Sequence, residues 1–214
     1  MTKRLKEICA HIPKSEVFAD VGCDHGYCAR YALDNGLCKR AYITDISEKC
    51  LEKAKSLLKG EIEAGVCIPL VGDGLSVLPE PATVLIAGMG GEEIVKILSV
   101  KMPPVFLLQP MKNTEKVRRF LLEKGCRIAL DVTFEDGKFY DLISGTSEGG
   151  DVYSEREIVY GRDNLKTPSP AFRKKIKQER DKIMGYLNAS PSDEEREKLQ
   201  KRLAEKENLL HEIG

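Results

Sequence analysis

Acidic residues and glycines alternate in one segment that directly follows an apolar run, Asp20-Val21-Gly22-Cys23-Asp24-His25-Gly26-Tyr27. Glycine lets a ligand approach the backbone, and carboxylates accept hydrogen bonds from ammonium groups. A dinucleotide-binding segment would read G-x-G-x-x-G and cradle phosphate. Here the spacing is G-x-x-x-G with two interleaved acids, which disfavours phosphate and suits the ammonium and sulfonium of S-adenosylmethionine. The alternative is an acidic turn without a ligand.

Two further acids lie where the next two apolar runs end. Asp45 follows the glycine segment by about twenty residues, where a carboxylate can accept both hydroxyl protons of a ribose. Alone this signal is weak, because such an aspartate can simply cap the next helix. Asp73, between Gly72 and Gly74, could accept a hydrogen bond from an adenine amino group. Three acidic strand ends in order predict a cofactor that contains adenosine.

A fourth segment, Ala87-Gly88-Met89-Gly90-Gly91, has almost no side chains. Such a backbone lets a bulky planar ligand lie against it, with Met89 as a cover.

The elements that must position these segments alternate along the chain. Apolar runs predict strands over 17–22, 41–45, 68–71, 83–88 and 105–109, with amphipathic helices before and between them. This alternation predicts a parallel sheet with both faces covered, a doubly wound α/β domain. The runs 127–135 and 138–146 flank Asp136-Gly137, a strong hairpin signal, so an antiparallel strand should end the sheet. This expected arrangement resembles the Rossmann-like sheet of class I S-adenosylmethionine-dependent methyltransferases.

The composition changes after about residue 150. The segment 147–170 is predicted to be rich in loops, and Ser169-Pro170 has the pattern of a helix start. Helices are expected over 171–188 and from Ser192, which forms a capping box with Glu195. We therefore predict two units, a catalytic domain over 1–150 and a coiled-coil-like helical hairpin within 151–214.

Composition excludes several classes of protein. The 214 residues include 34 basic and 34 acidic side chains, which argues against a uniformly basic nucleic-acid clamp but not against a local basic patch. No apolar run approaches the roughly 18 residues of a membrane span, and the start lacks a signal-peptide pattern. The seven cysteines are odd in number and lack C-x-x-C spacing, so we expect reduced thiols, no metal and a cytoplasmic protein.

The segments ADVGCDHGY, GDGLSVL, IAGMGGEEIVKIL and LLQP, in this order, resemble the TrmK family. Members of this family are bacterial enzymes that methylate N1 of adenine 22 in tRNA. The resemblance covers nearly the whole chain and implies an S-adenosylmethionine-dependent enzyme whose partner is tRNA.

Site residues follow from the segments and the resemblance together. Asp24 is the candidate for the charged catalytic group, because its loop must face the methyl donor. His25 and Tyr27 would stack on or bond to the base, although His25 could merely pin the loop and Tyr27 could pack in the core. Gln109 ends the fifth strand and is the candidate for contact with adenine. The predicted cofactor-binding residues are Asp20, Gly22, Asp24, Asp45, Ile46, Gly72, Asp73, Gly74, Ala87, Gly88, Met89 and Gly90.

Basic residues are concentrated between Lys166 and Lys182, where seven cations accompany two acids. We predict that Arg173, Lys174, Lys175 and Lys177 contact the phosphates of RNA, with Arg4 as a second basic candidate. A solvated helix face with internal ion pairs, or a surface for self-association, would have the same composition.

Other functions remain open at this point. The same cofactor could serve a small-molecule or protein substrate, or the chain could bind the cofactor without catalysis. A nicotinamide-dependent oxidoreductase fits least, because the phosphate-binding spacing is absent. We expect a monomer or a weak homodimer that does not bind a membrane.

Overall fold

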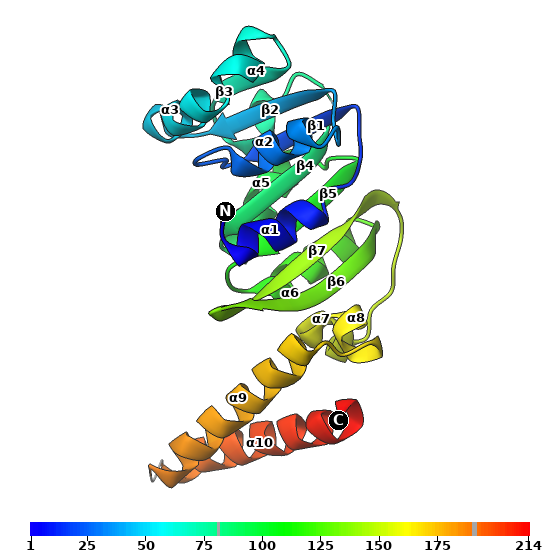
Figure 1. The fold of residues 1–214 in the computed structure, drawn as a ribbon. Helices are drawn as coiled ribbons and strands as arrows, with labels where there is room; N and C mark the ends of the chain where they lie inside the picture. The colour runs from blue at the N-terminus through cyan, green and yellow to red at the C-terminus, as the bar shows by residue number, and fades with distance from the viewer. Residues whose placement is uncertain (81, 190–191) are drawn as a thin grey trace.

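The computed structural model of the protein describes residues 1–80, 82–189 and 192–214, and its centre is a seven-stranded sheet (Figure 1). The strand order is β3-β2-β1-β4-β5-β7-β6. The strands are β1 (Val17–Val21), β2 (Arg40–Asp45), β3 (Cys67–Val71), β4 (Thr83–Met89), β5 (Val105–Pro110), β6 (Cys126–Asp136) and β7 (Lys138–Gly149). The predicted strands are therefore confirmed, with ends that shift by at most a few residues.

The direction of pairing changes once across the sheet. The pairs from β3 to β5 are parallel, whereas β7 runs antiparallel to both β5 and β6. Asp136 pairs with Lys138 around Gly137, whose φ of 67° lies in the left-handed region that glycine adopts readily. The predicted turn and the antiparallel strand are both confirmed.

Helices cover both faces of this sheet and complete two apolar cores. They are α1 (Lys3–Ala10), α2 (Tyr27–Asp34), α3 (Glu48–Leu57), α4 (Lys59–Glu63), the 3-10 helix η1 (Gly74–Val77), α5 (Gly91–Val100) and α6 (Thr114–Glu123). On one face Ile8, Ala29 and Leu51 from α1, α2 and α3 join a cluster of buried residues that includes Phe18 of β1. The other cluster contains residues of α5 and α6. Alternate residues of each buried strand therefore serve opposite cores.

The segment 147–170 is more ordered than we predicted from its composition. It contains α7 (Glu155–Tyr160) and α8 (Arg162–Lys166), so the prediction of a loop-rich connection is wrong. Ser154 accepts from the backbone of Glu157, whose carboxylate accepts from the backbone of Ser154. This capping box, S-x-x-E, was readable in the sequence, but both helices are too short to show a clear apolar period.

A buried ion pair attaches these two short helices to the sheet. The guanidinium of Arg118 on α6 is fully buried and donates to both carboxylate oxygens of Asp131 on β6, with the shortest distance at 2.8 Å. The same guanidinium donates to the carbonyls of Ile158 and Val159 on α7. Asn164 of α8 accepts from the Thr133 backbone at 2.8 Å. Residues 155–166 are thus bonded to the sheet.

The last two helices form an antiparallel hairpin, which projects from the sheet beyond β6 (Figure 1). They are α9 (Pro170–Asn188) and α10 (Asp193–Ile213), and the predicted caps at Ser169 and Ser192 are confirmed. At the base of the hairpin Phe172 and Ile176 are buried with Tyr160 and Leu209. Within the described ranges no helix has both the length and the apolar character needed to cross a lipid bilayer.

Replacing Arg118 with methionine leaves the carboxylate of Asp131 buried without its cation. We expect the free energy of unfolding to fall by about 3 to 5 kcal/mol, measured by urea denaturation. The matched control, Arg118→Met with Asp131→Leu, removes both charges and should recover most of this loss. If the double variant is as unstable as the single one, the cause is the loss of the other contacts of Arg118, with the Ile158 and Val159 carbonyls and with Asp141, and not the unpaired charge of Asp131.

Candidate functional site

Two adjoining clefts open at the carboxyl ends of the parallel strands, where open α/β sheets bind their ligands. The first, of about 140 Å³, is lined by Arg4, Leu5, Asp20, Gly22, Cys23, Asp24, His25, Tyr27, Cys28 and Ala87. The second, of about 180 Å³, is lined by Val21, Gly22, Thr44, Asp45, Ile46, Gly72, Asp73, Gly74, Met89, Glu93, Lys96 and Ile97. Most of the predicted cofactor-binding residues therefore lie together, on either side of Gly22.

Gly22 separates the two clefts and leaves no room for a side chain. Its φ is +69°, and a Cβ built on it would lie 2.1 Å from Cε of Met89. The Met89 side chain therefore lies directly against the Gly22 backbone and borders the second cleft. The left-handed φ and this close contact explain why residue 22 is glycine.

Asp20 is the buried acid of the first cleft, with 5% of its surface exposed. Burial raises the pKa of Asp20 to about 7, although the Ala29 backbone N–H donates to its carboxylate at 3.3 Å and opposes the shift. A cation placed in the cleft would favour the ionised form of this carboxylate. The first cleft thus contains a group suited to an ammonium ligand.

Asp24, His25 and Tyr27 form the exposed rim of the first cleft. Asp24 accepts from His25 at 2.7 Å and from Lys53 of α3 at 3.2 Å, and the rings of His25 and Tyr27 stack with centroids 5.5 Å apart. Burial opposes ionisation of Asp24, but the bonds from His25 and Lys53 outweigh it and lower its pKa. Tyr27 is 42% exposed, so the alternative of a packed core ring is wrong.

Asp45 and Asp73 border the second cleft from the ends of β2 and β3. One carboxylate oxygen of Asp45 accepts from the Ser47 backbone at 2.8 Å, but the side chain that caps the next helix is that of Ser47, so the alternative that Asp45 simply caps this helix is wrong. Asp45 lines the same cleft as Ile46, which is 77% exposed. An exposed apolar residue beside a carboxylate suits a ligand with both a planar face and hydroxyl groups.

Arg4 and Gln109 lie differently from what we predicted. Gln109 is fully buried, accepts from the Arg4 guanidinium at 3.0 Å and donates to the Pro110 carbonyl at 2.9 Å. The guanidinium of Arg4 also lies 5.6 Å from the ring centroid of Tyr140. Arg4 is therefore part of the first cleft and not an unengaged surface cation, and the amide of Gln109 is already occupied by protein partners.

The four basic residues of α9 separate into two pairs. Lys174 bonds to Glu135 at 2.6 Å and Lys175 bonds to the buried Asp141 at 3.1 Å, so both hold the hairpin against β6 and β7. Arg173 and Lys177 are exposed and have no ion pair among the described residues. Of the four predicted RNA-contacting residues on α9, only Arg173 and Lys177 are therefore exposed cations without an ion pair among the described residues.

Sequence reasoning missed several residues that line the clefts. Glu93, Lys96 and Ile97 of α5 border the second cleft, and Cys28 of α2 borders the first. The glycine segment before α5 was the available signal, since it turns the start of this helix toward the site. Gly88 and Gly90, which we predicted as ligand contacts, line neither cleft.

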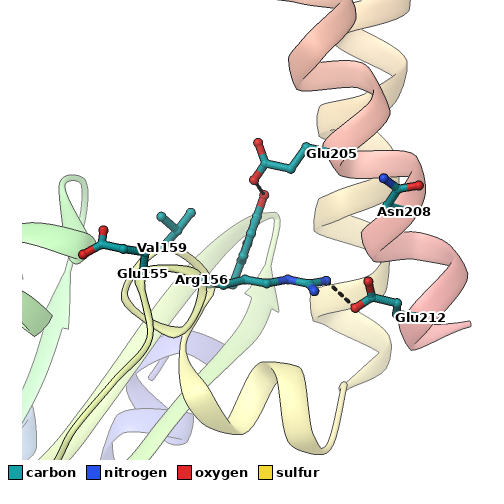
Figure 2. Close-up of a pocket in the computed structure, with 7 residues that line it drawn as sticks. Glu155, Arg156, Val159, Glu205, Asn208 and Glu212 are labelled. Carbon is teal, nitrogen blue, oxygen red and sulfur yellow. Dashed lines mark hydrogen bonds and ion pairs between the residues drawn. The ribbon is translucent and has the colours of Figure 1, made fainter.

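A larger groove of about 380 Å³ lies elsewhere, between α7 and α10 (Figure 2). Its acids have protein partners: Tyr160 donates to Glu205 at 2.6 Å, Arg156 pairs with Glu212 and Arg119 pairs with Glu155. This groove is a seam between the hairpin and the sheet. In the described residues no cluster of three or more His, Cys, Asp or Glu side chains could hold a metal ion.

The raised pKa of Asp20 predicts how stability depends on pH. Unfolding allows Asp20 to ionise near its ordinary value of 3.8, whereas the folded chain keeps it protonated until about pH 7. The free energy of unfolding should therefore fall as pH rises between these values, by at most about 1.4 kcal/mol per pH unit. Urea denaturation of Asp20→Asn and wild type should give a difference that grows in favour of the variant from pH 5 to 7.5.

Asp24→Asn is the matched control, because its carboxylate is exposed and its pKa is lowered, not raised. A constant difference between wild type and Asp20→Asn over this pH range would contradict the buried, protonated state of Asp20.

Comparison with known proteins matches residues 1–143 to the methyltransferase domain family. A Bacillus subtilis tRNA (adenine(22)-N(1))-methyltransferase is 28% identical over the whole of this chain and 96% of its own length. A Mycoplasma pneumoniae protein, provisionally described as a tRNA methyltransferase, is 35% identical over 61% of this chain, and the match spans only 62% of that protein.

A solved structure extends the comparison to the fold. TrmK of M. capricolum, in complex with S-adenosyl-homocysteine, superposes with a TM-score of 0.88 at 22% identity and covers 100% of this chain and 99% of its own. The chain therefore belongs to the methyltransferase domain family, and its resemblance to the TrmK family extends over its full length.

Proposed function

We propose that this protein transfers the methyl group of S-adenosylmethionine to N1 of an adenine in tRNA, at position 22. The observation that carries the proposal is the pair of clefts around Gly22, placed at the strand ends of a chain similar along its whole length to a tRNA (adenine(22)-N(1))-methyltransferase. Because tRNA is the proposed substrate, we infer that the protein acts in the cytoplasm.

The residues of both clefts fit S-adenosylmethionine, which when bound supplies an electrophilic methyl group on its sulfonium. In the first cleft the Asp20 carboxylate would hold the ammonium, while the Arg4 guanidinium offers a cation for a carboxylate. In the second cleft Asp45 would accept from the ribose hydroxyls and Asp73 from the adenine amino group. Gly22 lines both clefts, so a ligand that spans them would cross its backbone, where the flexible end of the Met89 side chain lies.

Asp24 is the proposed catalytic residue for methylation at N1. This reaction makes the adenine ring cationic, so a carboxylate beside the base stabilises the charge that develops or accepts a proton from N6. The lowered pKa of Asp24 keeps its carboxylate ionised at neutral pH. The stacked rings of His25 and Tyr27 lie beside it and would orient the base, since positioning is the main catalytic requirement of this reaction.

In this proposal the catalytic unit carries out methyl transfer, and the helical hairpin binds the RNA. The division at residue 150 remains a proposal, and the ion pair of Arg118 supports placing α7 and α8 with the catalytic unit. Phosphate contacts supply most of the non-specific affinity of a protein for nucleic acid. Arg173 and Lys177 are the exposed cations of α9 that we propose for these contacts.

The decisive test incubates the full chain with labelled S-adenosylmethionine and an unmodified tRNA transcript. Nucleoside mass spectrometry should then find 1-methyladenosine, and a transcript with guanosine at position 22 should receive no label. Detection of 6-methyladenosine would overturn the N1 assignment. Label on a small molecule or a protein would favour the alternative substrates, and cofactor binding without any transfer would favour a silent binding protein.

Asp24→Asn should reduce methyl transfer at least tenfold, because it removes the charge that stabilises the cationic base and keeps the shape of the side chain. Single-turnover rates at saturating cofactor and tRNA measure this, since weaker cofactor binding would otherwise lower the rate as well. Lys53→Gln is the matched control, because it removes a partner of Asp24 and retains the carboxylate. A rate for Asp24→Asn near that of the wild type would exclude Asp24 as the catalytic residue.

Arg173→Gln with Lys177→Gln should weaken tRNA binding and reduce its dependence on salt. Each lost phosphate contact lowers the slope of log K against log salt by somewhat under one unit. The single variant Lys174→Gln serves as the control, because Lys174 bonds to Glu135 and should change the slope less. If sedimentation shows an altered oligomeric state and the salt slope is unchanged, the hairpin serves self-association instead.

A further inference from the structure

We propose that a groove at the tip of the helical hairpin binds an unstacked base of the tRNA, with Tyr186 as the stacking platform and Lys198 and Arg202 on the adjoining phosphates. This site deepens the proposed function and rests on it. The end of α9 and the start of α10 lie at the opposite end of the molecule from β1, β2 and β3 (Figure 1), whose ends border the clefts, so a substrate that reaches both must be large.

The groove is defined by residues of both helices. It has a volume of about 490 Å³ and is lined by Tyr186 and Ala189 of the first helix end and by Glu195, Lys198, Leu199 and Arg202 of α10. Tyr186 is 64% exposed, whereas Phe172, the other Phe or Tyr ring of the hairpin, is fully buried. The packing of the hairpin therefore does not account for the Tyr186 ring.

The charges around the Tyr186 ring favour an anionic partner. The groove lining contains two cations, Lys198 and Arg202, and one acid, Glu195, and the segment 198–202 contains no acid, although 193–197 contains four. The carboxylate of Glu195 is occupied, because it accepts from the Ser192 hydroxyl at 2.8 Å and from its backbone. Lys198 pairs with the exposed Glu194, a surface ion pair that contributes little and exchanges readily.

An exposed aromatic ring beside cations is the arrangement by which proteins hold single-stranded nucleotides. Every base has a flat face that can stack on an aromatic side chain, and the cations bind the backbone on either side. Arg202 has no ion pair among the residues that the structure describes, so its guanidinium is available for a phosphate. Unpaired bases in loops and bulges are the parts of a folded RNA that can be recognised in this way.

A second copy of the chain fits this groove less well than RNA. A two-fold dimer would bring the same surface of both copies together, so the cations Lys198 and Arg202 would lie in an interface that contains a second set of the same cations. Stable interfaces bury roughly 800 Å² on each partner around an apolar centre. The groove offers only Tyr186, Ala189 and Leu199 as apolar lining, beside like charges.

The test measures binding of a fluorescently labelled, unmodified tRNA transcript to the full chain by anisotropy at three salt concentrations. Tyr186→Ala should weaken binding at least about fivefold, whereas Tyr186→Phe, which keeps the ring, should stay within about twofold of the wild type. Arg202→Gln should lower the salt slope by somewhat under one unit. Asn188→Ala, exposed at the same end of α9 and outside the groove lining, is the matched control and should bind as the wild type does.

Ultraviolet cross-linking followed by peptide mass spectrometry should place RNA on the peptide that contains Tyr186. Unchanged affinity of Tyr186→Ala, or cross-links confined to residues 1–166, would overturn the proposal. So would sedimentation that shows a wild-type dimer dissociated by Tyr186→Ala at unchanged tRNA affinity. If the wild type forms 1-methyladenosine and Tyr186→Ala has the same KM for tRNA, only the proposed role of the groove in binding a base is wrong. If the wild type neither binds nor methylates tRNA, the proposed function itself is wrong.

Discussion

The buried charges around Arg118 connect the parts of this molecule. The guanidinium binds Asp131 on β6 and two carbonyls on α7, and it lies 3.8 Å from Asp141, which in turn receives Lys175 from α9. Burial raises and the two cations lower the pKa of Asp141, with a net lowering, so this carboxylate stays ionised between them. A catalytic sheet and a helical hairpin thus share one set of charges, and neither can be repacked without the other.

The second constraint is the contact between Gly22 and Met89, which lies between the two clefts. A side chain at residue 22 would be strained by its φ of +69° and would push aside the end of the Met89 side chain. The two acids that flank Gly22 in the sequence differ in environment, because Asp20 is buried and Asp24 is exposed to solvent and cations. The end of β1 and the loop after it therefore hold one carboxylate whose pKa is raised to about 7 by burial and one whose pKa is lowered by His25 and Lys53.

Most of the sheet could be predicted because buried parallel strands are continuous apolar runs and Asp136-Gly137 marks the only antiparallel turn we expected. The acidic strand ends were predicted for the same reason, since topology alone brings them to one edge. The bonds that engage the cations Arg4, Lys174 and Lys175 could not be predicted. Their partners are Gln109, Glu135 and Asp141, and each is distant from its cation in the sequence. Helices α7 and α8 escaped prediction because tertiary bonds, not an apolar period, hold them.

The described bonds between the hairpin and the rest of the protein lie toward one end of it, so a small rotation at this end moves the other end by a larger distance. The 19 residues of α9 extend for about 28 Å at 1.5 Å per residue, and its bonds to β6 and β7 lie near the end where it starts, whereas α7 bonds to the C-terminal half of α10. At that length a tilt of about 5° at the base moves the tip by roughly 2.5 Å, close to the span of one hydrogen bond. The stiffness of a few ion pairs at the pivot therefore determines how accurately the far end is aimed at a large substrate.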